Sequence, residues 1–156
     1  VIIGIDDYES YPLFGCVLDA RLIEKFFTEK LGVPPNRIKL LLGSKESFGD
    51  AMTPSHANIV HTLLGLATNH DIEFGDNIVI YFAGHGCCYH PSREDDPYGC
   101  VETLCPIDRD TIDANHKHVP DISDWEFSSI ISLIAKAKGH RITVILDCCH
   151  AGGINR

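Results

Sequence analysis

ITVILDCCHAGG, residues 142–153, joins a run of apolar and β-branched residues to a carboxylate, two thiols and an imidazole. A short continuous apolar run of this kind is typical of a strand buried on both faces of a parallel sheet. Because open α/β sheets place functional groups at the carboxyl ends of their strands, we expect the reactive part of the molecule here. The candidate groups, in chain order, are Asp147, Cys148, Cys149 and His150.

Composition indicates one globular domain, residues 1–156, with 44% hydrophobic and 22% charged residues. A net charge of −9 without a basic cluster argues against nucleic acid as a partner. No apolar run approaches the roughly 20 residues of a membrane span. Seven cysteines, with two adjacent pairs, do not form a secreted disulfide framework, so we expect a reducing, cytoplasmic setting. Because the chain opens within a strand, we expect a domain truncated at both ends.

Hydrophobic periodicity predicts alternating strands and helices. Apolar runs predict strands at 1–6, 37–42, 77–82 and 142–146. Helical stripes predict helices that start at Asp19, at Thr53-Pro54 and at Ser123, where Glu126 completes a capping box. This alternation is typical of an α/β fold with a mainly parallel sheet of about four core strands and helices on both faces.

Residues 87–122 do not fit this alternation, because they are long, polar and rich in Asp, Pro and His. Loops of this length are usually functional or mobile, and only 101–107 is expected to form a hairpin arm. The segment carries several possible zinc ligands, but no pair has Cys-x-x-Cys spacing, so we expect no structural zinc. These residues are Cys87, Cys88, His90, Cys100 and Cys105.

His85 follows the third strand between two glycines, and Cys149 follows the fourth. If these strands are neighbours, the imidazole and a thiol face each other, as a cysteine nucleophile and its base require. Gly86 leaves room for a peptide, and the N–H groups of Gly86 and Cys149 are candidates for an oxyanion hole. Taken singly, a solvated histidine and a core cysteine are the ordinary alternatives.

Five segments together resemble the caspase-like cysteine peptidases, above all the metacaspases and the caspase-domain proteins of fungi and bacteria. They are VIIGIDDY, GCVLDA, NIVIYFAGHG, GCVETLCPID and ITVILDCCHAGG. The resemblance implies a caspase-like three-layer αβα sandwich, here its large-subunit portion without the small subunit. It also implies that His85 is the catalytic histidine and Cys149 the nucleophile. Cys148 is then a packing residue, and His150 is not the base.

The resemblance also bears on specificity. Metacaspases build an acidic pocket for Arg or Lys from carboxylates that match Asp147 and Asp19, although Asp19 could equally cap a helix. Ala83 stands where many metacaspases place a serine that lines this pocket. The glutamine that caspases carry two residues before the nucleophile is absent, so we expect cleavage after Arg or Lys and not after Asp.

Calcium binding, which many metacaspases require, is not expected here. The matching segments place Val101 and Trp125 where the family has aspartate ligands. Hard cations need several oxygen ligands, so we expect Ca²⁺ independence and no cofactor.

The leading hypothesis is therefore a cysteine endopeptidase acting on proteins or peptides with a His85/Cys149 dyad. The alternative is a non-cleaving caspase-fold module that acts as a regulator or scaffold. A nucleotide or flavin binder is disfavoured, because the chain lacks the glycine-rich loops of such proteins. We expect a small-subunit segment or chain as partner, and exposed sheet edges favour chain–chain contacts such as a homodimer.

Overall fold

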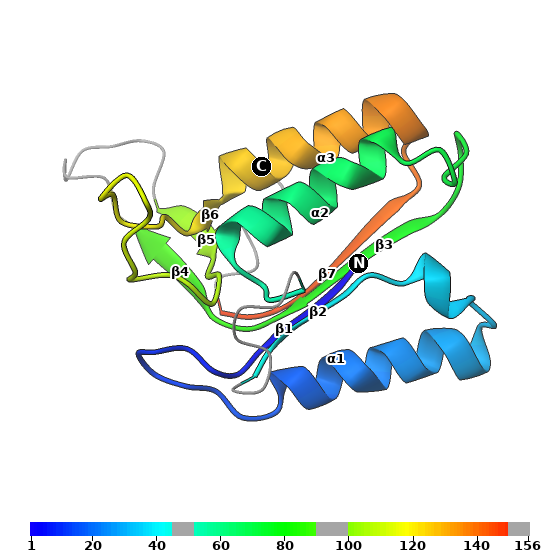
Figure 1. Cartoon of the computed structure of the whole chain (residues 1–156). Coiled ribbons are helices and arrows are strands. Elements are labelled where there is room, and N and C mark those ends of the chain that lie inside the picture. Colours follow the sequence, from blue (N-terminus) through cyan, green and yellow to red (C-terminus); the bar gives the residue numbers. More distant parts are fainter. Residues whose placement is uncertain (45–51, 90–99, 150–156) are drawn as a thin grey trace.

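A four-stranded parallel sheet forms the centre of the molecule (Figure 1). The computed structural model describes residues 1–44, 52–89 and 100–149. The strands of this sheet lie in the order β2-β1-β3-β7. They are β1 (Ile2–Ile5), β2 (Leu40–Gly43), β3 (Ile78–Ala83) and β7 (Ile142–Asp147). The expected parallel sheet of four strands is confirmed.

Helices cover both faces of this sheet, as the alternation predicts. Helix α1 (Cys16–Lys25) lies on one face, and α2 (His56–Thr68) and α3 (Asp124–Lys138) lie side by side on the other (Figure 1). A π-helical turn at Phe26–Lys30 extends α1. A 3-10 turn at Pro35–Arg37 precedes β2, which begins at Leu40 rather than at the predicted residue 37. None of the helices in the described ranges combines the length and apolar character that a bilayer crossing requires.

The two faces of the sheet bury separate apolar clusters. The larger cluster lies under α2 and α3 and includes Ile59, Phe82 and Ile134, each at most 1% exposed. The smaller cluster lies under α1, where Ala20 packs with Ile2 and Tyr81. This division explains why the strands β1 and β3 are apolar on both sides.

Strand β7 corrects one expectation, because it is not buried on both faces. It is the edge strand of the sheet, and half-buried and exposed residues alternate along it. Val144 and Leu146 pack against the larger cluster, whereas Ile145 is 41% exposed on the opposite face. The physical reason is that α1 is the only helix on that face among the described elements, and it packs over β1, β2 and β3.

Two of the three expected helix starts also need correction. Asp19 is not a helix cap: α1 begins at Cys16, and the carboxylate of Asp6 accepts hydrogen bonds from the first-turn N–H groups of Cys16 and Val17. Helix α2 is capped by Ser55 rather than Thr53. For α3 the prediction is confirmed, because Ser123 accepts a hydrogen bond from the N–H of Glu126.

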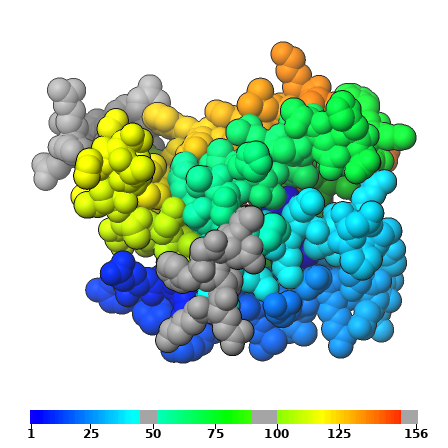
Figure 2. All heavy atoms as spheres, in the orientation of Figure 1, coloured from blue at the N-terminus to red at the C-terminus, as the bar shows by residue number. Residues whose placement is uncertain are grey.

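A second sheet, which the sequence analysis largely missed, occupies the predicted loop. It is antiparallel and consists of β4 (Gly86–Tyr89), β5 (Val101–Leu104) and β6 (Ile122–Ser123). A disulfide joins Cys88 to Cys100, a pair that the sequence analysis did not predict. Figure 2 shows the yellow segment after β5 at the same end of the molecule as the dark-blue loop after β1.

Gly4 provides a test of the packing between β1 and α1. A Cβ atom at this position would lie 2.5 Å from the carbonyl oxygen of Cys16 and 2.6 Å from the Cβ of Ala20. We expect Gly4→Ala to lower the free energy of unfolding by about 1–3 kcal/mol, because the helix must move outward. Urea unfolding followed by circular dichroism measures this change.

Gly65→Ala is the matched control for that measurement. Gly65 lies in α2, and a Cβ there meets no atom within 4 Å. Alanine has the higher helix propensity, so this variant should be stabilised by up to about 1 kcal/mol. Equal effects of the two substitutions would contradict the packing described for β1.

Candidate functional site

The pairing of β3 with β7 brings the two predicted reactive segments together. The strands pair in parallel from Ile78 and Ile142 to Ala83 and Asp147. The N–H of Gly84 extends this contact to the carbonyl of Asp147 at 3.4 Å. His85 and Cys149 each follow the last paired position by two residues, so they leave the sheet at the same edge. The expectation that these strands are neighbours is confirmed.

Gly86 is the point of closest approach between the two segments. A Cβ atom placed on Gly86 would collide with the carbonyl oxygen of Cys149 and would lie 3.3 Å from the sulfur of Cys148. Only glycine therefore lets the backbone of Cys149 lie against the start of β4. His85 is the residue before Gly86 and so precedes this point of close approach directly in the chain.

The imidazole of His85 is oriented by a backbone carbonyl. Its Nε2 lies 2.7 Å from the carbonyl oxygen of Tyr11, in the loop after β1. A carbonyl oxygen can only accept, so Nε2 must carry the proton in this arrangement. In the neutral ring, Nδ1 then bears the lone pair that a general base needs.

Tyr8 is a site residue that the sequence analysis did not single out. It is 3% exposed, and its ring lies 4.6 Å from the ring of His85. Its hydroxyl accepts a hydrogen bond from the N–H of His85 at 2.9 Å and donates one to the carbonyl of Cys105 at 3.0 Å. The N–H of Cys105 donates in turn to the carbonyl of His85 at 3.0 Å. Burial raises the pKa of Tyr8, so its hydroxyl stays protonated as this network requires.

The two adjacent thiols lie in different environments. Cys149 is exposed, whereas Cys148 is half-buried and packs against the larger core cluster. Burial, followed by the neighbouring Cys149 and Asp147, raises the pKa of Cys148 to about 11. Cys148 therefore remains a neutral thiol near neutral pH. His150 lies outside the described residues.

Asp19 and Asp147 form an acidic patch on the α1 side of the sheet. Both are exposed, and the Tyr81 hydroxyl donates a hydrogen bond to Asp147 at 3.4 Å. Burial, then the charges of Asp147 and Asp19, raises the pKa of Tyr81 to about 12. Burial, then Asp6, Asp147 and Asp19, raises the pKa of Cys16 to about 11. Asp19 and Asp147 thus both raise the pKa values of Tyr81 and Cys16, although the two carboxylates are 128 positions apart in the sequence.

Ala83, the third predicted specificity position, is paired with Asp147 in the sheet. It is 1% exposed and belongs to the smaller apolar cluster with Tyr81 and Ala20. Ala83 therefore exposes almost no surface to a ligand, and the charged side chain at this pair of positions is that of Asp147.

The cysteines considered for zinc separate into two groups. Cys88 and Cys100 form the disulfide, and His90 lies outside the described residues. Cys87 and Cys105 instead lie close to the carboxylate of Asp121. Of the positions considered for calcium, Val101 is a half-buried residue of β5 and Trp125 is exposed at the start of α3.

Comparison with solved structures shows the fold. A crystal structure of the Geobacter sulfurreducens protein GSU0716 superposes with a TM-score of 0.69 over 99% of this chain and 51% of that one, at 20% sequence identity. The expected caspase-like αβα fold is confirmed.

Comparison with known sequences shows the family. Metacaspase-4 of Arabidopsis thaliana is 31% identical over 99% of this chain and 33% of its own length. Metacaspase-1 of Cryptococcus neoformans is 29% identical over 92% of this chain and 30% of its own length. The chain thus spans about a third of the length of these curated relatives. A family model described as the metacaspase, peptidase C14 domain matches residues 1–155, and the chain belongs to this family of cysteine peptidases.

Proposed function

We propose that this chain carries the catalytic dyad of a cysteine endopeptidase, with Cys149 as nucleophile and His85 as acid and base. The observation that carries the proposal is the approach of the Cys149 backbone to Gly86, directly beside a histidine whose Nε2 is fixed by Tyr11. A thiol within reach of an oriented imidazole is the arrangement that nucleophilic catalysis requires. The exposure of Cys149 allows a peptide to reach it.

The proposed reaction has two stages. In acylation, His85 takes the thiol proton through Nδ1, Cys149 attacks the peptide carbonyl carbon, and the same proton passes to the leaving amine. In deacylation, His85 takes a proton from water, and the hydroxide releases the carboxylic acid from the thioester and returns the thiol. The backbone N–H groups of Gly86 and Cys149 are the proposed donors to the oxyanion in both stages.

The acidic patch of Asp19 and Asp147 supports cleavage after Arg or Lys. Asp147 lies two residues before the nucleophile in the chain. We therefore assign the substrate side chain bound there to the residue on the N-terminal side of the cleaved peptide bond. A cationic side chain that binds here gains from two negative charges, whereas an acidic one is repelled.

We propose that the enzyme includes more chain than residues 1–156, which span about a third of the curated relatives. Strand β7 leaves one edge of the parallel sheet open among the described strands. We place the small-subunit segment, or a second chain, along this edge. Activity tests therefore use the full-length protein.

The choice of nucleophile is tested with fluorogenic peptides that end in Arg, Lys or Asp. Cys149→Ala should lower kcat/KM on the Arg and Lys peptides by at least about a thousandfold, because the covalent step is lost. Cys148→Ala is the matched control and should retain most of the activity. Loss of activity in Cys148→Ala alone would overturn the assignment, and no cleavage by the wild-type protein would favour the scaffold alternative.

The acidic patch is tested with the same peptides. Asp19→Asn and Asp147→Asn should each lower kcat/KM for the Arg peptide by at least about tenfold, since each removes one counter-charge for the substrate cation. Asp71→Asn, at an exposed position beyond α2, serves as the control and should leave kcat/KM unchanged. The specificity proposal fails if the two patch variants cleave the Arg peptide as well as the wild type.

The role of Tyr8 in holding His85 is tested by Tyr8→Phe. The loss of one buried hydroxyl leaves a donor and an acceptor without their partner, which should cost about 1–3 kcal/mol of stability and reduce kcat. Tyr11→Phe is the control, because Tyr11 supplies only its backbone carbonyl and its side chain is 84% exposed. Thermal unfolding and kcat should change in the first variant and not in the second.

A further inference from the structure

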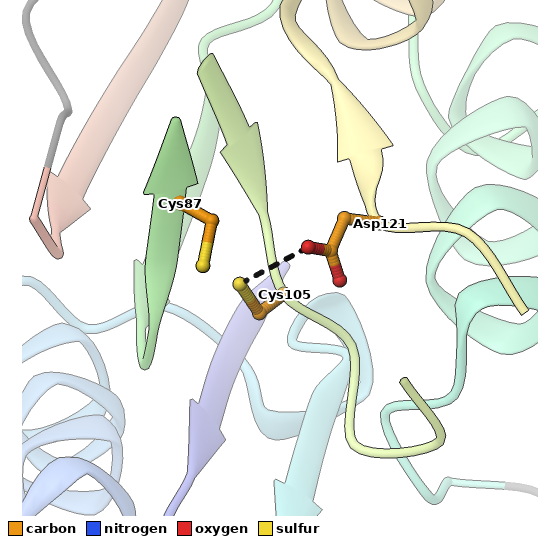
Figure 3. Close-up of side chains that lie close together, drawn as sticks. All are labelled: Cys87, Cys105 and Asp121. Atoms are coloured by element: carbon orange, nitrogen blue, oxygen red, sulfur yellow. Dashed lines mark hydrogen bonds between the residues drawn. The ribbon is translucent and has the colours of Figure 1, made fainter. Parts of the chain in front are cut away.

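Three potential metal ligands converge at the antiparallel sheet (Figure 3). Cys87 comes from β4, Cys105 follows β5, and Asp121 precedes β6. Figure 3 shows the two thiols and the carboxylate pointing toward one another. The proposed peptidase mechanism uses none of these side chains.

The spacing of the three groups matches a tetrahedral zinc site. One ligand atom from each residue lies within 4.8 Å of the other two, and Cys105 Sγ is 3.6 Å from Asp121 Oδ2. Zinc bonds of about 2.3 Å to sulfur and about 2.1 Å to oxygen, at a tetrahedral angle, place a sulfur and an oxygen ligand about 3.6 Å apart, so the Cys105 thiol and the Asp121 carboxylate group are at a suitable separation. Two thiolates on one zinc lie about 3.8 Å apart by the same geometry, which is below the 4.8 Å within which the ligand atoms of the three residues lie.

The carboxylate of Asp121 has a free coordination position. Its side chain is only 3% exposed, and Oδ2 receives the hydrogen bonds that come from Tyr89, Thr103, Cys105 and Arg109. Oδ1 is buried and has no hydrogen-bond partner among the described residues. A buried polar atom without a partner is costly, and a bound cation would remove that cost.

Charge balance favours an ion with two positive charges. Arg109 contacts Asp121 at 3.2 Å, so the cluster is neutral when both thiols are protonated. If a divalent ion replaces the two thiol protons, two thiolates and one carboxylate contribute −3, and the ion and Arg109 contribute +3. The buried cluster is then neutral again, so binding leaves no net charge in the interior.

A cavity lies on the Asp121 side of the cluster. A cavity of about 410 Å³ borders Asp121 and is lined also by Tyr89, Thr103 and Arg109. We take this cavity as the entry path of the proposed ion, with a water molecule as its fourth ligand. Cys87 is half-buried, whereas Cys105 is fully buried.

We propose that Cys87, Cys105 and Asp121 bind one thiophilic divalent metal ion of the zinc class. Binding joins β4, the end of β5 and the start of β6 through a single ion. Because the backbone of Cys105 is hydrogen-bonded to both His85 and Tyr8, the ion also stiffens the support of the histidine. The site is structural and lies outside the reacting groups.

Cobalt substitution tests the site in the full-length protein. The reduced protein carrying Cys149→Ala, which removes the exposed thiol, is titrated with Co²⁺ and then with Zn²⁺. We expect one equivalent of Co²⁺ to give the sulfur-to-cobalt charge-transfer band and the visible bands of a tetrahedral site, and Zn²⁺ to remove both. Cys87→Ser and Cys105→Ser in this background should lose the charge-transfer band, and Asp121→Asn should weaken binding by at least about tenfold.

Cys16→Ser is the matched control, because it removes a free thiol outside the cluster and should keep the band. In protein without these cluster substitutions, Zn²⁺ should protect Cys87 from alkylation and a chelator should restore the reaction, as mass spectrometry of peptides measures. This second measurement does not depend on the folding of the cluster variants, because it uses protein that lacks their substitutions. The proposal is overturned by the absence of a thiolate band, by a band that persists in both cluster cysteine variants, or by a Cys87–Cys105 disulfide without metal uptake.

Discussion

The parallel register between β3 and β7 is the constraint on which the rest of the site depends. It sets Ala83 opposite Asp147, and the segments that follow β3 and β7 then leave the sheet from the same edge. A shift of one residue would turn the side chains of one strand to the other face and separate the acidic patch from Tyr81. The buried residues of β3 oppose such a shift, because Ile80 and Phe82 face one core cluster and Tyr81 the other.

The peptide at His85 links the two sheets of the molecule. Its N–H is held by Tyr8, which follows the parallel strand β1, and its carbonyl is held by Cys105, which follows the antiparallel strand β5. Tyr8 closes the network by donating to the carbonyl of Cys105. A histidine flanked by two glycines would otherwise have wide backbone freedom. Two hydrogen bonds to its own peptide and one to its ring limit that freedom.

The sequence predicted those parts of the fold that depend on local pattern. Apolar runs and helical stripes located the parallel sheet and its helices, and Gly-His85-Gly and Asp147 marked the edge where the segments meet. Three features depended on contacts between distant residues and were missed or misplaced. They are the capping of α1 by Asp6, the half-exposed character of β7, and the bridge from Tyr8 to Cys105.

The antiparallel sheet shows why residue spacing alone was a poor guide to the second cluster. Cys-x-x-Cys spacing reports ligands that share one turn, whereas Cys87, Cys105 and Asp121 lie in or next to three different strands. Their proximity follows from the pairing of Gly86 with Leu104 and of Leu104 with Ile122. The same pairing positions Gly86 against Cys149. The short strands that bring the thiols to Asp121 are therefore the same strands that set Gly86 against the turn carrying Cys149.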